Sequence, residues 1–146
     1  MKIALVHGPN LHLLGRREPE VYGTDTLDDV NARVRALAVE LGVAVDAFQS
    51  NHEGGLIDWL TEASEGIDGV LINPGAFTHT SVALRDCLVG LGLPFVEVHL
   101  SNPASREPFR HRSYLSDVAV GVVYGFGADS YLLGLRGLVS RLNPTR

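Results

Sequence analysis

The sequence predicts an α/β protein with an open, five-stranded parallel sheet that is covered by helices on both faces. Along the chain, short and continuously apolar runs alternate with segments whose apolar residues recur every three or four positions. The first pattern is typical of parallel strands buried on both faces, and the second of amphipathic helices. Because the connections are short, successive strands are expected to lie in one sheet. This arrangement is flavodoxin-like, and 146 residues suit one domain, residues 1–146.

Five apolar runs are expected to be the strands, and in chain order they are residues 3–6, 43–48, 69–73, 94–100 and 118–123. They are rich in valine, isoleucine, leucine and phenylalanine, and glycine, proline or polar residues bound most of them. Each run is followed by a helical pattern or by a polar loop. The longest of these loops is expected over residues 101–116.

Four helices are expected, and each has a signal at its start or along its apolar face. In the first, Thr26 can cap the N-terminus, and Gly42 follows the last turn. The second carries its apolar residues within positions 56–60. The third and fourth are expected to start at residue 80 or 81 and at residue 129 or 130, and the fourth to end near residue 142.

The segment 15–23, which follows the first strand, reads Gly-Arg-Arg-Glu-Pro-Glu-Val-Tyr-Gly. Its glycine and proline content predicts a mobile loop rather than a helix or strand. It carries Arg17 and Tyr22 five residues apart, and a guanidinium close to a phenol favours the phenolate form. The segment therefore places a phenol that a nearby cation can acidify on a loop after the first strand. Local composition alone favours a surface loop with a packed tyrosine and solvated arginines.

Polar residues gather where three expected strands end. The segments concerned are residues 7–10, 73–81 and 97–103, which carry amides, imidazoles and hydroxyls. In open parallel sheets, ligands bind outside the carboxyl ends of the strands. The sequence therefore predicts one ligand-binding crevice at this edge. For Asn10 and Asn73, which stand next to prolines, ordinary turn formation is the alternative.

His99 is the strongest candidate for a catalytic acid. It lies two residues after Glu97 on an expected strand, so both side chains point to the same face. A neighbouring carboxylate stabilises the imidazolium and orients the ring. A buried histidine with satisfied hydrogen bonds is the alternative.

Composition narrows the classes of partner. The formal net charge of −5 argues against nucleic-acid binding, whereas two local basic clusters, at residues 16–17 and 106–112, indicate a small anionic ligand. The apolar runs are all shorter than a membrane span, and no signal peptide is expected before the first strand. A single cysteine, Cys87, fits a reducing compartment such as the cytoplasm, and its helical surroundings favour a core residue over a nucleophile.

Several common catalytic machineries do not match the sequence. The only lysine is Lys2, at the N-terminus, which argues against Schiff-base chemistry. The sequence contains no nucleophile elbow, Walker A or G-x-G-x-x-G motif, and its six histidines lack the usual zinc spacings. A zinc site is therefore not expected.

Several motifs together resemble those of the type II 3-dehydroquinate dehydratases. In chain order they are Gly8-Pro9-Asn10-Leu11, Arg17-Glu18-Pro19, Tyr22-Gly23, Gln49-Ser50-Asn51-His52-Glu53-Gly54, Asn73-Pro74-Gly75-Ala76, Thr78-His79, Glu97-Val98-His99-Leu100-Ser101-Asn102, Arg106-Glu107, Phe109-Arg110 and Ser113-Tyr114. They occur in the family's order over nearly the whole chain, which makes the resemblance specific.

The resemblance implies a cytoplasmic shikimate-pathway enzyme without a cofactor that dehydrates 3-dehydroquinate to 3-dehydroshikimate through an enolate. It also implies a homododecamer, a tetramer of trimers. Tyr22 looks like the base, His99 the acid, Arg17 the stabiliser of the charged transition state and Asn10 the holder of a water over the enolate. The residues that look like substrate contacts are Asn73, His79, Asp86, Leu100, Ser101 and Arg110, with Asp86 acting across the trimer interface. The resemblance also implies that the segment 15–23 is a lid that carries its own base, and Arg106 is expected near this lid.

Three other functions remain open on the residues alone. The first is a small-ligand binding module without catalysis, and the second is another carbon–oxygen lyase or hydrolase that uses the same crevice. The third is a flavin or nucleotide binder. Formation of the conjugated enone from dehydroquinate, which absorbs in the ultraviolet, separates the expected enzyme from a binding module.

Overall fold

The computed structural model describes residues 1–16 and 18–144. In this part of the chain, parallel strands form one sheet in the order β2-β1-β3-β4-β5. The strands are β1 (Lys2–His7), β2 (Ala44–Gln49), β3 (Gly69–Asn73), β4 (Phe95–His99) and β5 (Gly121–Tyr124). This is the flavodoxin-like order of a doubly wound sheet, which confirms the predicted fold class.

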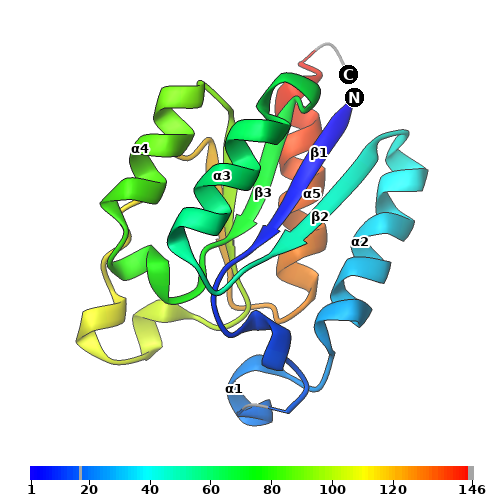
Figure 1. Ribbon diagram of the computed structural model, residues 1–146. Coiled ribbons are helices and arrows are strands. Elements are labelled where there is room, and N and C mark those ends of the chain that lie inside the picture. Colours follow the sequence, from blue (N-terminus) through cyan, green and yellow to red (C-terminus); the bar gives the residue numbers. More distant parts are fainter. Residues whose placement is uncertain (17, 145–146) are drawn as a thin grey trace.

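Helices cover both faces of the sheet. The longer ones are α2 (Leu27–Leu41), α3 (Glu53–Ala63), α4 (Val82–Leu91) and α5 (Asp129–Leu142). In Figure 1, α3 and α4 lie in front of the sheet and α5 lies behind it. Successive side chains of β1 point to opposite faces of the sheet, so the core has two parts. Ile3 and Leu5 pack with α2 and α5, whereas Ala4 and Val6 pack with α3 and α4.

The helix ends follow the signals in the sequence. The Thr26 hydroxyl accepts from the Asp29 N–H at 3.1 Å, and the Asp29 carboxylate accepts from the Thr26 N–H at 2.9 Å, which is a capping box. Gly42 ends α2 in the left-handed conformation. Of the two candidate caps for α4, the structure selects Ser81, whose hydroxyl accepts from the Leu84 N–H at 2.9 Å.

The sequence predicts an irregular loop over the segment 15–23, but part of this segment is helical. Residues Pro19–Tyr22 form a single helical turn, α1, at the end of the molecule where the strands end (Figure 1). Proline suits this turn because it stands at the first helical position, where its fixed φ is helical and its missing N–H is not needed. Glu18 before it and Gly23 after it both have positive φ, which confines the helix to one turn.

The fifth strand begins later than predicted. The N–H groups of Val118 and Ala119 donate to the carbonyl of Leu115, so these residues belong to a turn, and β5 starts at Gly121. The preceding loop contains two short 3₁₀ turns, Pro103–Ser105 and Pro108–Arg110. In the described part of the chain, no helix is long and apolar enough to cross a membrane.

His7, at the carboxyl end of β1, is fully buried beneath the sheet edge. Burial, reinforced by the charge of Arg35 and opposed by a hydrogen bond to Asn31, lowers the pKa of His7 from 6.5 to about 4. In the unfolded chain the same imidazole titrates near 6.5, so the unfolded state binds more protons between these two pH values. The stability that neutral His7 contributes is therefore present above about pH 6.5 and is lost as the pH falls towards 4.

We expect this difference to lower the free energy of unfolding by about 2 kcal/mol between pH 7 and pH 5. Urea denaturation at the two pH values measures it. His7→Gln removes the titrating group, so its stability should fall by correspondingly less over the same interval. Equal losses in the variant and the wild type would show that His7 does not carry this pH dependence.

Candidate active site

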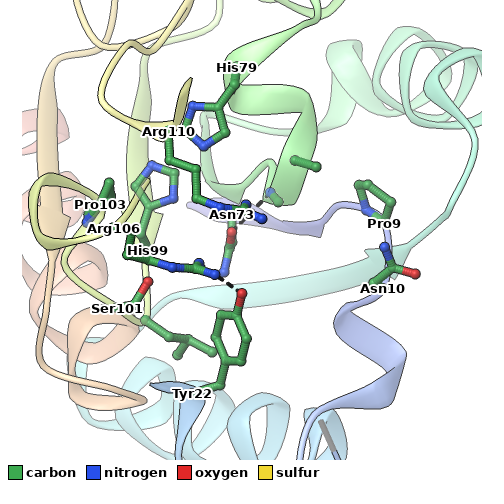
Figure 2. A pocket seen from close by; sticks show the side chains of 13 residues that line it. Pro9, Asn10, Tyr22, Asn73, His79, His99, Ser101, Pro103, Arg106 and Arg110 are labelled. Atoms are coloured by element: carbon green, nitrogen blue, oxygen red, sulfur yellow. Dashed lines mark hydrogen bonds between the residues drawn. The ribbon is translucent and has the colours of Figure 1, made fainter. Parts of the chain in front are cut away.

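A pocket lies at the carboxyl edge of the sheet, where the sequence predicts one (Figure 2). Residues from the ends of β1, β3 and β4, from α1 and from the loop after β4 line it. They are Pro9, Asn10, Tyr22, Asn73, Gly75, Ala76, His79, His99, Leu100, Ser101, Pro103, Arg106 and Arg110. Figure 2 shows His79 and Arg110 at one end of this group and Tyr22 at the other. Eight of the ten predicted site residues are therefore brought together.

The other two predicted residues are Arg17 and Asp86. Arg17 lies outside the described residues. Asp86 lies on α4, where it lines a shallow groove with Ile57 and Cys87 rather than the pocket of its own chain. Cys87 is partly buried in the α3–α4 core, as expected, and burial raises the pKa of its thiol.

Tyr22 contacts the guanidinium of Arg106, a partner that the sequence did not predict for it. Arg106 Nη1 donates a hydrogen bond to the Tyr22 hydroxyl at 2.8 Å, and the guanidinium carbon lies 5.3 Å from the centre of the ring. The Arg106 side chain is only 16% exposed, so its charge is partly shielded from water. A donor that carries a positive charge stabilises a phenolate more than a phenol. The signal in the sequence was the basic cluster at 106–112, but nothing local connects it to a tyrosine 84 positions earlier.

His99 and Glu97 contact each other, as their spacing predicts. Glu97 is buried, and its Oε2 lies 2.5 Å from His99 Nε2. Its other oxygen accepts from Ser113 and Ser116 at 3.0 and 2.9 Å. Burial by itself would raise the pKa of Glu97, but the hydrogen bonds and charge of His99, with the two serines, hold it below its usual value.

An ionised Glu97 orients the His99 ring through the contact with Nε2. Because Nε2 is held by the carboxylate, Nδ1 is the ring nitrogen left to serve a ligand in the pocket that His99 lines. The pair can therefore present a proton at a fixed position and stabilise the charge of the imidazolium that carries it.

His79 is held by the loop that follows β4. Its Nδ1 lies 2.7 Å from the carbonyl oxygen of Arg112. A carbonyl can only accept, so Nδ1 carries a proton and donates it. In the neutral ring, Nε2 is then an acceptor, which suits the hydroxyl group of a ligand.

Asn10 is fixed through its backbone. It has a φ of 68°, in the left-handed region, which asparagine tolerates better than most residues. Its N–H donates to Asn51 Oδ1 at 3.0 Å, and the same oxygen accepts from Gln49 at 3.2 Å. The polar loop after β2 therefore supports the loop that carries Asn10.

Gly8 allows the ends of β1 and β3 to meet. A Cβ atom on Gly8 would lie 2.2 Å from the carbonyl oxygen of Pro74, a distance that no side chain can adopt. Gly8 N–H also donates to the Asn73 carbonyl at 2.8 Å. This close approach places Asn10 and Asn73 on one pocket.

The remaining polar lining residues supply anion-binding groups. The Arg110 Nε donates to Glu107 at 2.7 Å, which holds the guanidinium at the pocket while leaving further N–H groups. Leu100 and Ser101 follow His99 directly and line the same pocket. In residues 1–16 and 18–144, no three histidine, cysteine, aspartate or glutamate side chains gather as a metal site would require.

Comparison with known proteins gives a consistent result. Residues 1–139 match the family model described as "Dehydroquinase class II". The 3-dehydroquinate dehydratase of Geotalea daltonii is 54% identical over 142 residues, which cover 97% of this chain and 99% of the relative. That of Bordetella avium is 59% identical over 135 residues, which cover 92% and 94% of the two chains.

Solved structures agree with these sequence relatives. The type II dehydroquinase of Butyrivibrio crossotus superposes with a TM-score of 0.92 at 40% identity, over 94% of this chain and 97% of that one. The enzyme of Propionibacterium acnes superposes with a TM-score of 0.90 at 42% identity, over 95% and 96%. With its fold, its pocket and its relatives in agreement, this chain belongs to the class II dehydroquinases, a family of hydro-lyases.

Proposed function

We propose that residues 1–146 form one catalytic domain that dehydrates 3-dehydroquinate to 3-dehydroshikimate, with Tyr22 as the base and His99 as the acid. The observation that carries this proposal is the arrangement of two activated groups on one pocket. A phenol bonded to a guanidinium and an imidazole bonded to a carboxylate both line it. Elimination of water needs this combination, because one group must remove a proton and the other must supply one.

In the first step, Tyr22 as phenolate takes the proton from the carbon beside the ketone of the substrate. The electron pair of that C–H bond moves towards the ketone, and negative charge builds on the ketone oxygen. A water held by Asn10 stabilises this enolate. Arg106 donates a hydrogen bond to the Tyr22 oxygen, and its positive charge stabilises the negative charge of a phenolate there.

In the second step, the enolate expels the hydroxyl group one carbon further on. His99 gives its proton to that hydroxyl, which leaves as water, and the enone forms. Glu97 stabilises the imidazolium before the transfer and holds the neutral ring in place after it. To begin another turnover, Tyr22 returns its proton to solvent and His99 takes one up.

The other lining residues hold the substrate in position. Arg110 offers N–H groups to its carboxylate or hydroxyls, as do the backbone N–H groups at Leu100 and Ser101 and the Ser101 side chain. His79 and Asn73 can bond the ring hydroxyls. We also propose, from the family motif, that Arg17 stabilises the charged transition state when the 15–23 segment closes over the pocket.

We further propose that the protein works in the cytoplasm as a homododecamer, a tetramer of trimers. The position of Asp86 supports a role for a neighbouring subunit, since this carboxylate lies on α4 and lines a groove away from the pocket of its own chain. To reach a substrate, it would have to act on the pocket of another copy. Sedimentation equilibrium of the wild type measures the assembly.

The test of the proposed function is an ultraviolet assay with 3-dehydroquinate. The product is a conjugated enone, so turnover gives a rise in absorbance that follows enzyme concentration. Binding of dehydroquinate without this rise would favour the alternative, a small-ligand binding module. Yellow colour or stabilisation by nucleotides would instead favour a cofactor binder.

Arg106→Lys tests the guanidinium that contacts the base. Lysine keeps the positive charge but loses the planar group that both donates to the Tyr22 oxygen and lies against its ring. We expect kcat to fall by about 10- to 100-fold, with a smaller change in KM, because one charge-assisted hydrogen bond is worth about 1.5–3 kcal/mol. Steady-state kinetics in the ultraviolet assay measure both constants.

Arg112→Lys is the matched control for this variant. Arg112 also lies over a tyrosine ring, that of Tyr114, at 5.0 Å, but neither residue lines the pocket as described. Its replacement should leave kcat within about twofold of the wild type. If Arg106→Lys behaved like this control, Arg106 would have no part in activating Tyr22.

A further inference from the structure

A chain of hydrogen bonds runs through the core beneath the pocket. It connects α2 and α5 with the end of β3. The hydroxyl of Tyr131, on α5, lies 3.0 Å from His7 Nδ1, and His7 Nε2 lies 2.7 Å from Asn31 Oδ1 on α2. His7 and Asn73 are aligned on the neighbouring strands β1 and β3, so their side chains share the face of the sheet that α5 covers. There, a side-chain hydrogen bond with Asn73 influences the pKa of Tyr131. Tyr131 and His7 are completely buried, and Asn73 lines the pocket.

The backbone at Gly75 sets the direction of this chain. The Gly75 N–H donates to Asn73 Oδ1 at 3.1 Å, and an N–H can only donate, so the amide oxygen of Asn73 must face it. The NH₂ group of Asn73 is then available for Tyr131. Burial raises the pKa of Tyr131 above its usual value, and the hydrogen bond with Asn73 acts in the opposite direction.

The positions of the other protons in the chain follow from this orientation of the Asn73 amide. The Tyr131 oxygen accepts from Asn73, so its own proton points to His7 Nδ1, the acceptor within reach. His7 then carries its proton on Nε2 and donates it to Asn31 Oδ1. Each donor in the chain meets an acceptor, with neutral His7 in one defined tautomer.

We propose that Tyr131 and His7 are positioning residues that fix the orientation of the Asn73 amide at the pocket. The terminal torsion of asparagine is broad and roughly two-fold, so either its oxygen or its nitrogen can face a given group. Holding the oxygen on Gly75 and the nitrogen on Tyr131 removes that choice. A ligand therefore meets one arrangement of donor and acceptor. Figure 2 shows Asn73 in the middle of the lining side chains.

The burial of so many polar groups supports this role. Tyr131 stands on the same buried face of α5 as Leu135 and Leu138, where an apolar side chain would fill the space without needing partners. Buried polar groups are costly unless all are satisfied, and a fully connected network specifies one arrangement. The inference rests on the proposed function in one respect, namely that 3-dehydroquinate is the ligand that Asn73 meets.

Tyr131→Phe tests the proposal, because it removes the hydroxyl and keeps the ring. We expect KM for 3-dehydroquinate to rise about tenfold and kcat to change by less than about threefold, as when a binding contact is weakened equally in the ground and transition states. In an Asn73→Ala background, the same replacement should change KM by less than about twofold, because no amide remains to orient. Equal effects in both backgrounds would overturn the proposal.

Leu138→Val is the matched control for a general loss of packing on α5. It should lower the melting temperature and leave KM within about twofold of the wild type. A rise in KM as large as that of Tyr131→Phe would assign the effect to packing. The wild-type assay separates the two hypotheses, because an inactive wild type would refute the proposed function, whereas an active wild type with an unchanged Tyr131→Phe refutes the positioning role.

Nitrogen NMR of the wild-type protein gives a test that does not depend on the folding of a variant. At neutral pH, His7 should show a protonated Nε2 and an unprotonated, hydrogen-bonded Nδ1. The opposite tautomer, or a ring that exchanges between the two, would reverse or break the chain and overturn the proposal.

Discussion

Tyr22→Phe is expected to lower kcat by at least about a thousandfold, while KM changes by less than about fivefold. The replacement removes one oxygen atom, the one that accepts from Arg106 at 2.8 Å and that would take the substrate proton. Described residues of the pocket that could hold the substrate, such as Arg110 and Ser101, are left in place. The ultraviolet assay with 3-dehydroquinate measures turnover, and isothermal titration measures binding to the inactive variant.

The control for this variant is Tyr114→Phe. Tyr114 also contacts an arginine, Arg112, but is not among the residues that line the pocket. It should retain turnover within about twofold of the wild type. Retention of more than about a tenth of wild-type turnover by Tyr22→Phe would show that another group removes the proton.

His99→Gln is expected to lower kcat by about 10²- to 10⁴-fold, the range that general acid catalysis usually contributes. Glutamine can still form a hydrogen bond with Glu97, but it cannot give a proton to a departing hydroxyl group. Hydroxide leaves poorly without protonation, so the second step becomes slow. Proton removal by Tyr22 does not require His99, so exchange of the substrate proton with deuterated solvent should persist in the variant.

Two comparisons make this test specific. His52→Gln removes an exposed imidazole at the start of α3 and should leave kcat unchanged within about twofold. Glu97→Gln should lower kcat less than His99→Gln, since it removes the carboxylate charge that stabilises the imidazolium but keeps the acid itself. If His99→Gln abolished proton exchange as well as turnover, His99 would act in the first step, and the assignment of acid and base would have to be exchanged.

Much of the fold could be predicted because its signals are local. A buried parallel strand is a run of apolar residues, and a capped helix carries its cap beside it, as Thr26 does for α2. The structure differs from the prediction where contacts between residues distant in the sequence determine the local conformation. Local composition could not show that Pro19 begins a helical turn, nor that Val118 turns back to Leu115 instead of entering the last strand.

The same distinction applies to the site. Glu97 and His99 could be paired from their spacing, because alternate residues of a strand share a face. Arg106 could not be assigned to Tyr22, since the two lie on different loops and only the fold brings them together. The bond between His7 and Tyr131 spans 124 positions and has no local signature either.

The close approach at Gly8 bears on how sequence variation in this protein should be interpreted. Gly8 has no side chain to react with or bind a substrate, and its φ is not positive. It is nevertheless intolerant of any substitution, because the carbonyl of Pro74 occupies the place of a Cβ atom. A mutational scan would rank it beside Tyr22 and His99. The cause of its intolerance would be the short distance between the ends of two strands. Tolerance to mutation alone therefore cannot distinguish residues that react with the substrate from residues that only hold the strand ends together.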